Sequence, residues 1–198
     1  SSSRVMATCS LIGQAVGTGV ALAVKCGCSP RDIDVAQLQQ ELMLDDCYIP
    51  YKERKLSRLT LEADTNAEIV RDGIDRNFGD LVHCWRGRKG EYIEYSFNSP
   101  QYVEKLRLVF DSNLQREYLN MPSNYPLNET KYKLPDTLVR SYSVVAVTET
   151  GEEVLEKVCN NRRRLVFHDI NKRIKSIRIV PETTWGCSEY RIFAVDLL

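Results

Sequence analysis

The sequence predicts a mainly β protein, in which an antiparallel β-sandwich follows two helices. Over the first quarter of the 198 residues, apolar side chains recur at helical spacing. From about residue 58 the pattern changes to alternation of every second residue, and turn-forming residues separate the short runs with no long helix between them. We therefore expect two parts: a helical segment with a linker, residues 1–56, and a β domain, residues 57–198. About 140 residues are enough for one domain with its own core.

The first predicted helix covers the apolar stretch of residues 5–24. One row of small residues and one row of bulkier apolar residues run along it at i, i+4 spacing: Cys9, Gly13, Gly17 and Ala21, beside Ile12, Val16, Val20 and Val24. Glycine inside a helix costs about 1 kcal/mol relative to alanine, so these glycines predict close packing against a sheet or a bound ligand. The chain also opens without Met inside this apolar helix. We expect a C-terminal fragment whose first helix is buried in a larger protein.

A membrane span is the alternative for this helix, since Gly13 and Gly17 have the spacing of a helix-dimerisation motif. Polar residues interrupt the stretch, however, and Lys25 follows at once without the usual interfacial anchors. No basic region precedes it, as a signal peptide would require. We favour a buried helix of a soluble protein.

The second predicted helix is shorter and has two candidate starts. Ser29 is a good capping residue followed by Pro30, and Asp34 would instead cap a helix that begins at Val35. An apolar stripe at Val35, Leu38 and Leu42 gives this helix one buried face. The charged residues 52–55 then indicate a solvated linker.

Alternating or β-branched runs predict the strands of the second part, at residues 92–97, 103–110, 142–147, 165–167, 174–179 and 192–195. Turn chemistry predicts the connections between them, at residues 98–100, 150–151, 169–172 and 183–188.

The segment RVMATCSLIGQAVGTGVALAVKCGCSPRDID resembles the last helix of the FAD domain in oxidoreductases grouped with the A-type subunit of heterodisulfide reductase, through its Gly-Gln-Ala-Val-Gly run at residues 13–17. In such proteins the amino end of this helix points at the flavin. The resemblance therefore implies FAD as the cofactor of the full-length parent, beside Ser3, Arg4, Val5 and Met6. Backbone N–H groups and the helix dipole would stabilise charge on the flavin there.

The rest of the chain resembles the same proteins. The Leu-Gln-x-x-Leu pattern of the second helix recurs after their FAD domain. The segments VRDGIDRNFGDLVHCW, EYIEYSFNSPQYVEKLRLVFDSNL, LPDTLVRSY and CNNRRRLVFHDINKRIKSIRIVPETTWGCSEYRIFAVDLL are similar to a galactose-binding-like, discoidin-type jelly roll. The resemblance implies an accessory jelly-roll domain on an FAD-dependent oxidoreductase. The missing FAD-binding domain would be its partner.

The chain holds no G-x-G-x-x-G motif that would cradle the FAD pyrophosphate. This fragment is therefore expected to be incompetent in catalysis alone and to retain no cofactor. We assign no catalytic residue. His83 and His168 each lie beside a strand-like run, where we expect a surface residue or a hydrogen-bonded core residue, and the sequence shows no nucleophile elbow. Asp72 and Asp75 flank Gly73; we favour an ordinary turn there over a calcium loop.

Seven cysteines raise the question of a metal or disulfide site. The pair Cys26 and Cys28 has weak spacing for zinc, and no Cys-x-x-Cys run suits an iron–sulfur cluster. We predict no metal site. The odd count favours reduced thiols in a cytosol-like compartment and leaves export open.

Charge balance, with 27 acidic and 27 basic residues, argues against a nucleic-acid or acidic-membrane surface. The densest basic run, residues 162–164, is expected to form a solvated strand edge that discourages edge pairing. A phosphate or carboxylate ligand is an open alternative for this run, without a specific indication in the sequence. The Asn128 glycosylation triplet is interpreted as a chance match.

Sugar binding at loop tips would use exposed aromatic platforms, for which the candidates are Trp85, Tyr118, Tyr125, Tyr132 and Trp185, especially in the loop of residues 121–135. For Trp85 and Trp185 we favour burial in the core instead. Beside the oxidoreductase hypothesis, two others from different classes remain. The sandwich is a carbohydrate-binding module, or it is purely structural and forms an oligomer contact.

Overall fold

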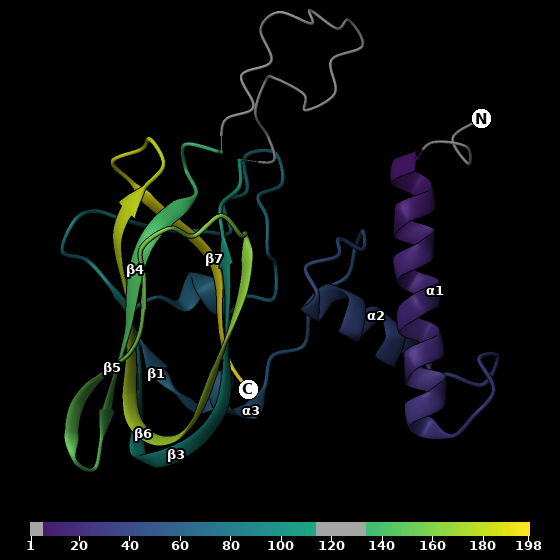
Figure 1. The fold of residues 1–198 in the computed structure, drawn as a ribbon, viewed down its shortest axis with the longest axis horizontal. Helices are drawn as coiled ribbons and strands as arrows, with labels where there is room; N and C mark the ends of the chain where they lie inside the picture. The colour runs from purple at the N-terminus through teal and green to yellow at the C-terminus, as the bar shows by residue number, and fades with distance from the viewer. Residues whose placement is uncertain (1–5, 114–133) are drawn as a thin grey trace, which may run out of the picture. The chain divides into compact units, whose positions relative to one another are not determined.

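The computed structural model describes residues 6–113 and 134–198 (Figure 1). The chain divides into two compact units, Ser1–Lys55 and Leu56–Leu198. The first is helical and the second is built mainly from β-strands. Each is described by itself below.

The first helix, α1 (Met6–Cys26), ends at a glycine. Gly27 has a φ of +65°, its N–H donates to the Val24 carbonyl over 3.2 Å, and the Cys28 N–H donates to the Ala23 carbonyl over 3.0 Å. This pair of bonds is a Schellman C-cap, which a residue other than glycine adopts only with strain. Lys25 in the last turn complements the negative end of the helix dipole.

The second helix, α2 (Val35–Leu44), begins at the later of its two candidate starts. The Asp34 carboxylate accepts a hydrogen bond of 2.8 Å from the Ala36 N–H, which is the N-cap interaction. Ser29 and Asp32 form a turn before it, closed by the Asp32 N–H donating to the Ser29 carbonyl over 2.9 Å. A start at Ser29 is therefore wrong, because the chain turns there instead of entering the helix.

In residues 56–113 and 134–198, the sandwich unit has a short helix, a 3₁₀ turn and seven strands: α3 (Arg58–Glu62), β1 (Asp64–Thr65), η2 (Glu68–Arg71), β2 (Trp85–Gly87), β3 (Ile93–Phe110), β4 (Val139–Thr148), β5 (Gly151–Val158), β6 (Leu165–Thr184) and β7 (Tyr190–Leu197). All pairings are antiparallel, as the sequence predicts. The hydrogen-bonded order is β2-β7-β3-β6-β4-β5, with β1 on β3. β2 and β5 were not expected: β2 is three residues long, and β5 is a Glu-rich edge strand whose pattern does not alternate.

Two long strands, β3 and β6, join both layers of the sandwich. Residues 93–96 of β3 pair with residues 176–179 of β6, whereas residues 105–109 pair with residues 165–169 and also with β7. Both strands curve round the lower end of the unit in Figure 1, so that one half of each strand lies in the first layer and the other half lies in the second.

The turns predicted at residues 98–100 and 169–172 are therefore wrong. Both segments lie in this corner, inside continuous strands. The register shifts between Ser96 and Gln101 and again between Val103 and Lys105, and Asn171 has a φ of 50°. Turn-forming residues here produce β-bulges, which bend a strand without ending it.

One large core fills the space between the layers. Its fully buried members include Tyr95, Leu106, Phe110, Tyr142, Ile177 and Ile192. They follow the alternation that predicted the strands. The Tyr95 hydroxyl also donates to the Val195 carbonyl over 3.0 Å, which links β3 in one layer to β7 in the other.

The first and last elements of this unit are bonded to each other. The Thr60 hydroxyl, which is fully buried, donates to the Leu197 carbonyl over 3.2 Å and accepts from the Leu197 N–H over 2.8 Å. The Ser57 hydroxyl also donates to the Leu197 carbonyl. The entry to the sandwich is thus fixed beside the end of β7.

A buried arginine holds the outer face of the layer formed by β3 and β7. Arg107 is 0% exposed; its Nη1 lies 3.0 Å from the Asp196 carboxylate and its Nη2 lies 2.8 Å from that of Asp75. Asp75 belongs to the connection between η2 and β2, and the Arg164 guanidinium donates to its backbone carbonyl. These contacts fasten that connection over a face that would otherwise be open to solvent.

We expect Arg107→Met to lower the free energy of unfolding by about 3–5 kcal/mol, because it leaves two carboxylates buried without their cation. Urea denaturation followed by circular dichroism measures this. Arg86→Met is the matched control, since Arg86 is exposed and lies 4.0 Å from Glu189; its loss should cost at most about 1 kcal/mol. Equal losses for the two variants would contradict a structural role for the buried pair.

Candidate functional site

The amino end of α1 is the predicted flavin contact. Met6 is the first residue of the helix and is 79% exposed, whereas Ser3, Arg4 and Val5 lie outside the described residues. No acidic side chain lies in the first turn. The backbone N–H groups of that turn have no partner within the helix, so this end carries the positive pole of the dipole. The four-residue assignment stays a prediction.

One side of α1 packs on α2. Leu22 and Ala23 are buried there, and a Cβ added to Gly19 would lie 3.3 Å from the Ile33 side chain and 3.8 Å from that of Leu38. Gly19 therefore allows the two helices to approach closely.

The other side of α1 is apolar and exposed within the described structure. Its bulky row is about half exposed or more: Ile12 55%, Val16 60%, Val20 47% and Val24 78%. Beside this row, a Cβ added to Gly13 or Gly17 would meet nothing within 4 Å. By length and composition alone, Thr8–Cys26 is also long and apolar enough to cross a membrane. We name the four bulky residues and the two glycines the open face of α1: Ile12, Gly13, Val16, Gly17, Val20 and Val24.

The second candidate region is one end of the sandwich, formed by residues 136–140, 159–164 and 184–189, which we name the loop end (the upper end of the unit in Figure 1). The Thr-Trp-Gly motif holds it together. The Trp185 N–H donates to the Leu138 carbonyl over 3.1 Å, and the Gly186 N–H donates to the Asp136 carbonyl over 3.0 Å. A Cβ at Gly186 would lie 2.7 Å from the Asp136 side chain, so only glycine fits.

Two arginines lie over the Trp185 ring. The guanidinium carbon of Arg140 is 4.9 Å from the ring centroid and that of Arg162 is 5.9 Å from it. The indole Nε1–H donates to the Asn161 carbonyl over 2.8 Å. The ring is half-buried and packs against the core. Trp185 is thus an anchor for the loop end and offers no open aromatic platform.

Trp85 is also half-buried and packed against the core. A Cβ at Gly87 would lie 2.0 Å from its ring, so the indole lies directly over that glycine. Both tryptophans therefore agree with the core interpretation. The other sugar-platform candidates, Tyr118, Tyr125 and Tyr132, with most of the loop of residues 121–135, lie outside the described residues. Among the described residues of the sandwich, the exposed aromatic side chains were not singled out as sugar platforms by the sequence: Phe78, Tyr92, Tyr102 and Phe167.

The basic run of residues 162–164 is only partly a solvated edge. Arg162 and Arg163 are exposed, but Arg164 is half-buried. The Arg164 guanidinium donates to the Phe110 carbonyl over 3.0 Å, and its carbon lies 5.1 Å from the Phe193 ring centroid. The prediction is wrong for this residue because its guanidinium donates to the backbone carbonyls of Phe110 and Asp75 and is held away from solvent.

Asp72 and Asp75 form part of a cross-linked turn. The Asp72 carboxylate accepts from the Ile74 N–H over 2.8 Å and lies 2.7 Å from Nδ1 of His83, while Asp75 pairs with Arg107. Gly73 has a φ of +80°. These contacts describe the ordinary turn. Within residues 6–113 and 134–198, no group of three or more His, Cys, Asp or Glu side chains is placed to hold a metal.

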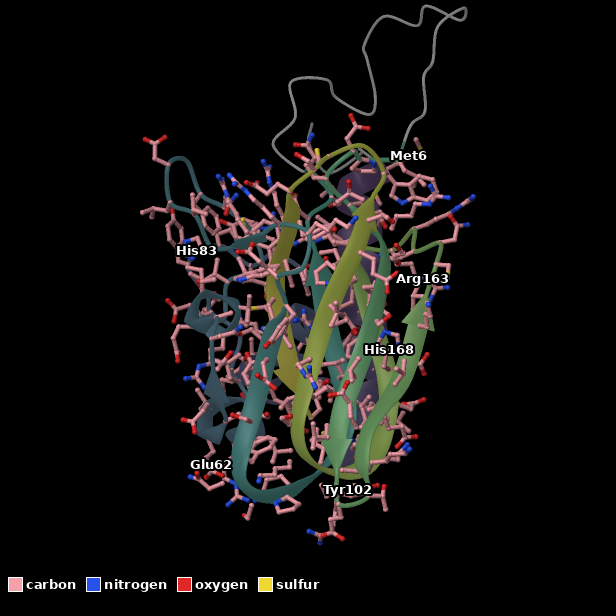
Figure 2. The ribbon with its side chains drawn as sticks, turned by 90° about the vertical axis from the view of Figure 1, so that its left-hand side faces the viewer. Met6, Glu62, His83, Tyr102, Arg163 and His168 are labelled. Carbon is pink, nitrogen blue, oxygen red and sulfur yellow. The ribbon has the colours of Figure 1, made fainter. Side chains whose placement is uncertain are left out.

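His168 is a satisfied core histidine. It is 8% exposed, and its Nε2 lies 2.9 Å from the Tyr142 hydroxyl. Figure 2 shows it midway along the sandwich, between Arg163 and Tyr102. Burial lowers the pKa of His168, since desolvation disfavours the imidazolium. Burial also raises the pKa of Tyr142, so the pair is neutral at pH 7.

The seven cysteines form no disulfide bond with one another in the described structure. Cys84 is buried, and burial raises the pKa of its thiol. Such a thiol is a poor nucleophile.

Comparison with known proteins gives a different result for each unit. A model of the family "FAD dependent oxidoreductase" matches residues 1–42, about a fifth of the chain. A fucose-binding module of Streptococcus pneumoniae aligns with a TM-score of 0.50 and 10% identity, covering 72% of this chain and 98% of the module. The family 32 carbohydrate-binding module of S. pneumoniae EndoD gives 0.49 and 12%, covering 72% and 99%. No curated protein sequence matches this chain. The sandwich therefore has the galactose-binding-like, jelly-roll fold of such modules.

We expect the stability of this chain to fall as the pH decreases below about 6.5, the unperturbed value for histidine, because the unfolded state then binds a proton that folded His168 resists. This residue contributes at most about 1.4 kcal/mol per pH unit. Urea unfolding at a series of pH values, compared between the wild type and His168→Gln, isolates the effect. Identical slopes for the wild type and His168→Gln would contradict the prediction.

Proposed function

We propose that this chain is the C-terminal part of an FAD-dependent oxidoreductase similar to the A-type subunit of heterodisulfide reductase, with the sandwich as an accessory domain. The match of residues 1–42 to the FAD-dependent oxidoreductase model carries the proposal. The Gly-Gln-Ala-Val-Gly run and the exposed apolar side of α1 support it. The finer family rests on the sequence resemblance.

In this proposal the amino end of α1, with Ser3, Arg4, Val5 and Met6, lies beside the flavin. When bound, FAD supplies the hydride or electron transfer chemistry. The residues present fit such a group, because the first turn carries no acidic side chain and Met6 is exposed. Its N–H groups would stabilise negative charge near the flavin through hydrogen bonds and the helix dipole.

The open face of α1 is assigned to the rest of the FAD-binding domain. Four exposed aliphatic side chains would gain burial there, and Gly13 and Gly17 leave space for a neighbouring backbone to approach the helix. Glycine inside a helix lowers the stability of the helix. This cost is offset only where a neighbouring backbone packs closely against the glycine.

A specific observation favours a second candidate function, carbohydrate binding by the sandwich: the similar structure at a TM-score of 0.50 is a fucose-binding module. Titration of the chain with fucose, galactose and N-acetylgalactosamine, followed by NMR chemical shifts, tests this candidate. Saturable shifts in the sandwich support it. No shift at millimolar sugar leaves the structural, oligomer-forming role as the assignment for the sandwich.

Purification of the full-length parent protein tests the oxidoreductase proposal. We expect a yellow protein with a flavin absorbance spectrum and about one FAD per chain. A colourless protein that cannot be reconstituted with FAD contradicts the proposal. So does a parent that lacks flavin and is recovered only with membranes, since α1 would then be a membrane span.

Gly17→Ala distinguishes the open face in the two contexts. In the 198-residue chain the added methyl group meets nothing, so we expect a gain in stability of up to about 1 kcal/mol. In the full-length parent it should cost about 1–3 kcal/mol through overpacking and reduce the flavin content. Thermal unfolding and flavin absorbance measure both effects. A stabilised parent with full flavin content would show that no domain packs closely at Gly17.

A further inference from the structure

Three arginines gather at the loop end without carboxylate partners. Arg140 lies at the start of β4, and Arg162 and Arg163 lie in the connection between β5 and β6; all three are exposed. Figure 2 shows Arg163 toward the end of the sandwich away from Tyr102. Within the described residues, none of the three forms an ion pair, whereas other arginines of the sandwich do: Arg58, Arg71, Arg86, Arg107, Arg178 and Arg191.

One buried asparagine fixes the backbone that carries these arginines. Asn161 is 6% exposed, and its backbone N–H donates to the Arg140 carbonyl over 2.8 Å. Its side-chain amide donates to the carbonyls of Val139 and Arg163 over 2.9 Å each, and its side-chain oxygen accepts from the Arg163 N–H over 2.9 Å. Its own carbonyl accepts the Trp185 indole N–H. The two segments and the indole are therefore held together by one residue.

The Trp185 ring restricts the side chains of two of these arginines. Arg140 and Arg162 both lie over its ring, at 4.9 and 5.9 Å. A cation–π contact with the ring leaves the N–H groups of a guanidinium able to donate to an acceptor. The contact restricts each side chain and thus limits the entropy that the arginine loses when it binds that acceptor.

The nearby acid does not neutralise the cluster. Asp136 lies on the same turn, where its side chain is placed against Gly186, and it forms no ion pair with the three arginines within the described structure. Arg140 and Arg162, which both lie over the Trp185 ring, repel each other, and a bound anion would relieve that repulsion. Forked N–H donors match the planar or tetrahedral oxygens of carboxylates, sulfates and phosphates.

We propose that Arg140, Arg162 and Arg163 form an oxyanion-binding site at the loop end, for a ligand that bears a carboxylate or a sulfate. The two arginines that cover the Trp185 ring disfavour stacking of a neutral sugar there. Two sources share this chemistry, an acidic saccharide and a free inorganic anion. The inference does not depend on the flavin proposal, because the site lies wholly within the sandwich unit.

Titration of the 198-residue chain tests the site, with tryptophan fluorescence and NMR shifts of the Trp185 indole N–H as readouts. The probes are an oligogalacturonate, inorganic sulfate and a neutral galactose oligosaccharide, at low salt. We expect saturable binding of the oligogalacturonate that weakens with added sodium chloride, and no shift of this N–H with the neutral sugar. Equal affinity for sulfate identifies a simple anion site, and tighter binding of the oligogalacturonate identifies an acidic-saccharide site. No saturable shift with either anion overturns the proposal.

Substitutions separate this site from diffuse surface charge. Arg140→Gln combined with Arg162→Gln should weaken anion binding about tenfold or more, because charge-assisted hydrogen bonds are lost. Arg163→Gln, which does not touch the Trp185 ring, should also weaken binding while leaving the thermal midpoint unchanged. Arg88→Gln is the control, since Arg88 is exposed and its substitution removes the same charge elsewhere; the affinity should stay within about twofold. Equal losses in the control and in Arg163→Gln overturn the proposal.

Discussion

The fold of the sandwich depends on the desolvated guanidinium of Arg107. A cation that is 0% exposed is costly unless carboxylates surround it, and here one comes from the neighbouring strand and one from a distant connection. The contact with Asp75 holds the connection between η2 and β2 against β3. This connection in turn covers the apolar side chains Val109 and Phe193, which would otherwise face solvent. A buried ion pair thus holds the connection between η2 and β2 in place.

Packing also comes first at the loop end, where Trp185 and Gly186 hold the chain together. The indole and its neighbours join three chain segments through backbone hydrogen bonds, and the contact between Gly186 and Asp136 leaves no room for a side chain. Any ligand chemistry at this end is superimposed on that anchor. The arginines can be presented to solvent because Asn161 and Trp185 already determine where their backbones and rings lie.

Periodicity in the sequence predicted the antiparallel sandwich, because alternating residues such as Tyr95 and Leu106 are buried in the core. It failed at residues 98–100 and 169–172, where Pro and Asn have the chemistry of a turn but produce a corner within a strand. Local patterns do not distinguish the two outcomes, which depend on whether pairing continues beyond the bend. Arg140 could not be found at all, since its relation to Trp185 arises only when β4 and β6 become neighbours. The amino end of α1 was suggested by resemblance, and three of its four residues lie outside the described structure.

The bonds between Thr60 and Leu197 have a consequence for evolution and for engineering. They hold the first and the last element of the sandwich unit next to each other, so both ends of the unit lie at the same place on its surface. A domain with adjacent ends can be joined to an unrelated domain, or transferred to another protein, without a long linker. Gain or loss of the sandwich among related proteins would then leave the structure of the neighbouring domain unchanged.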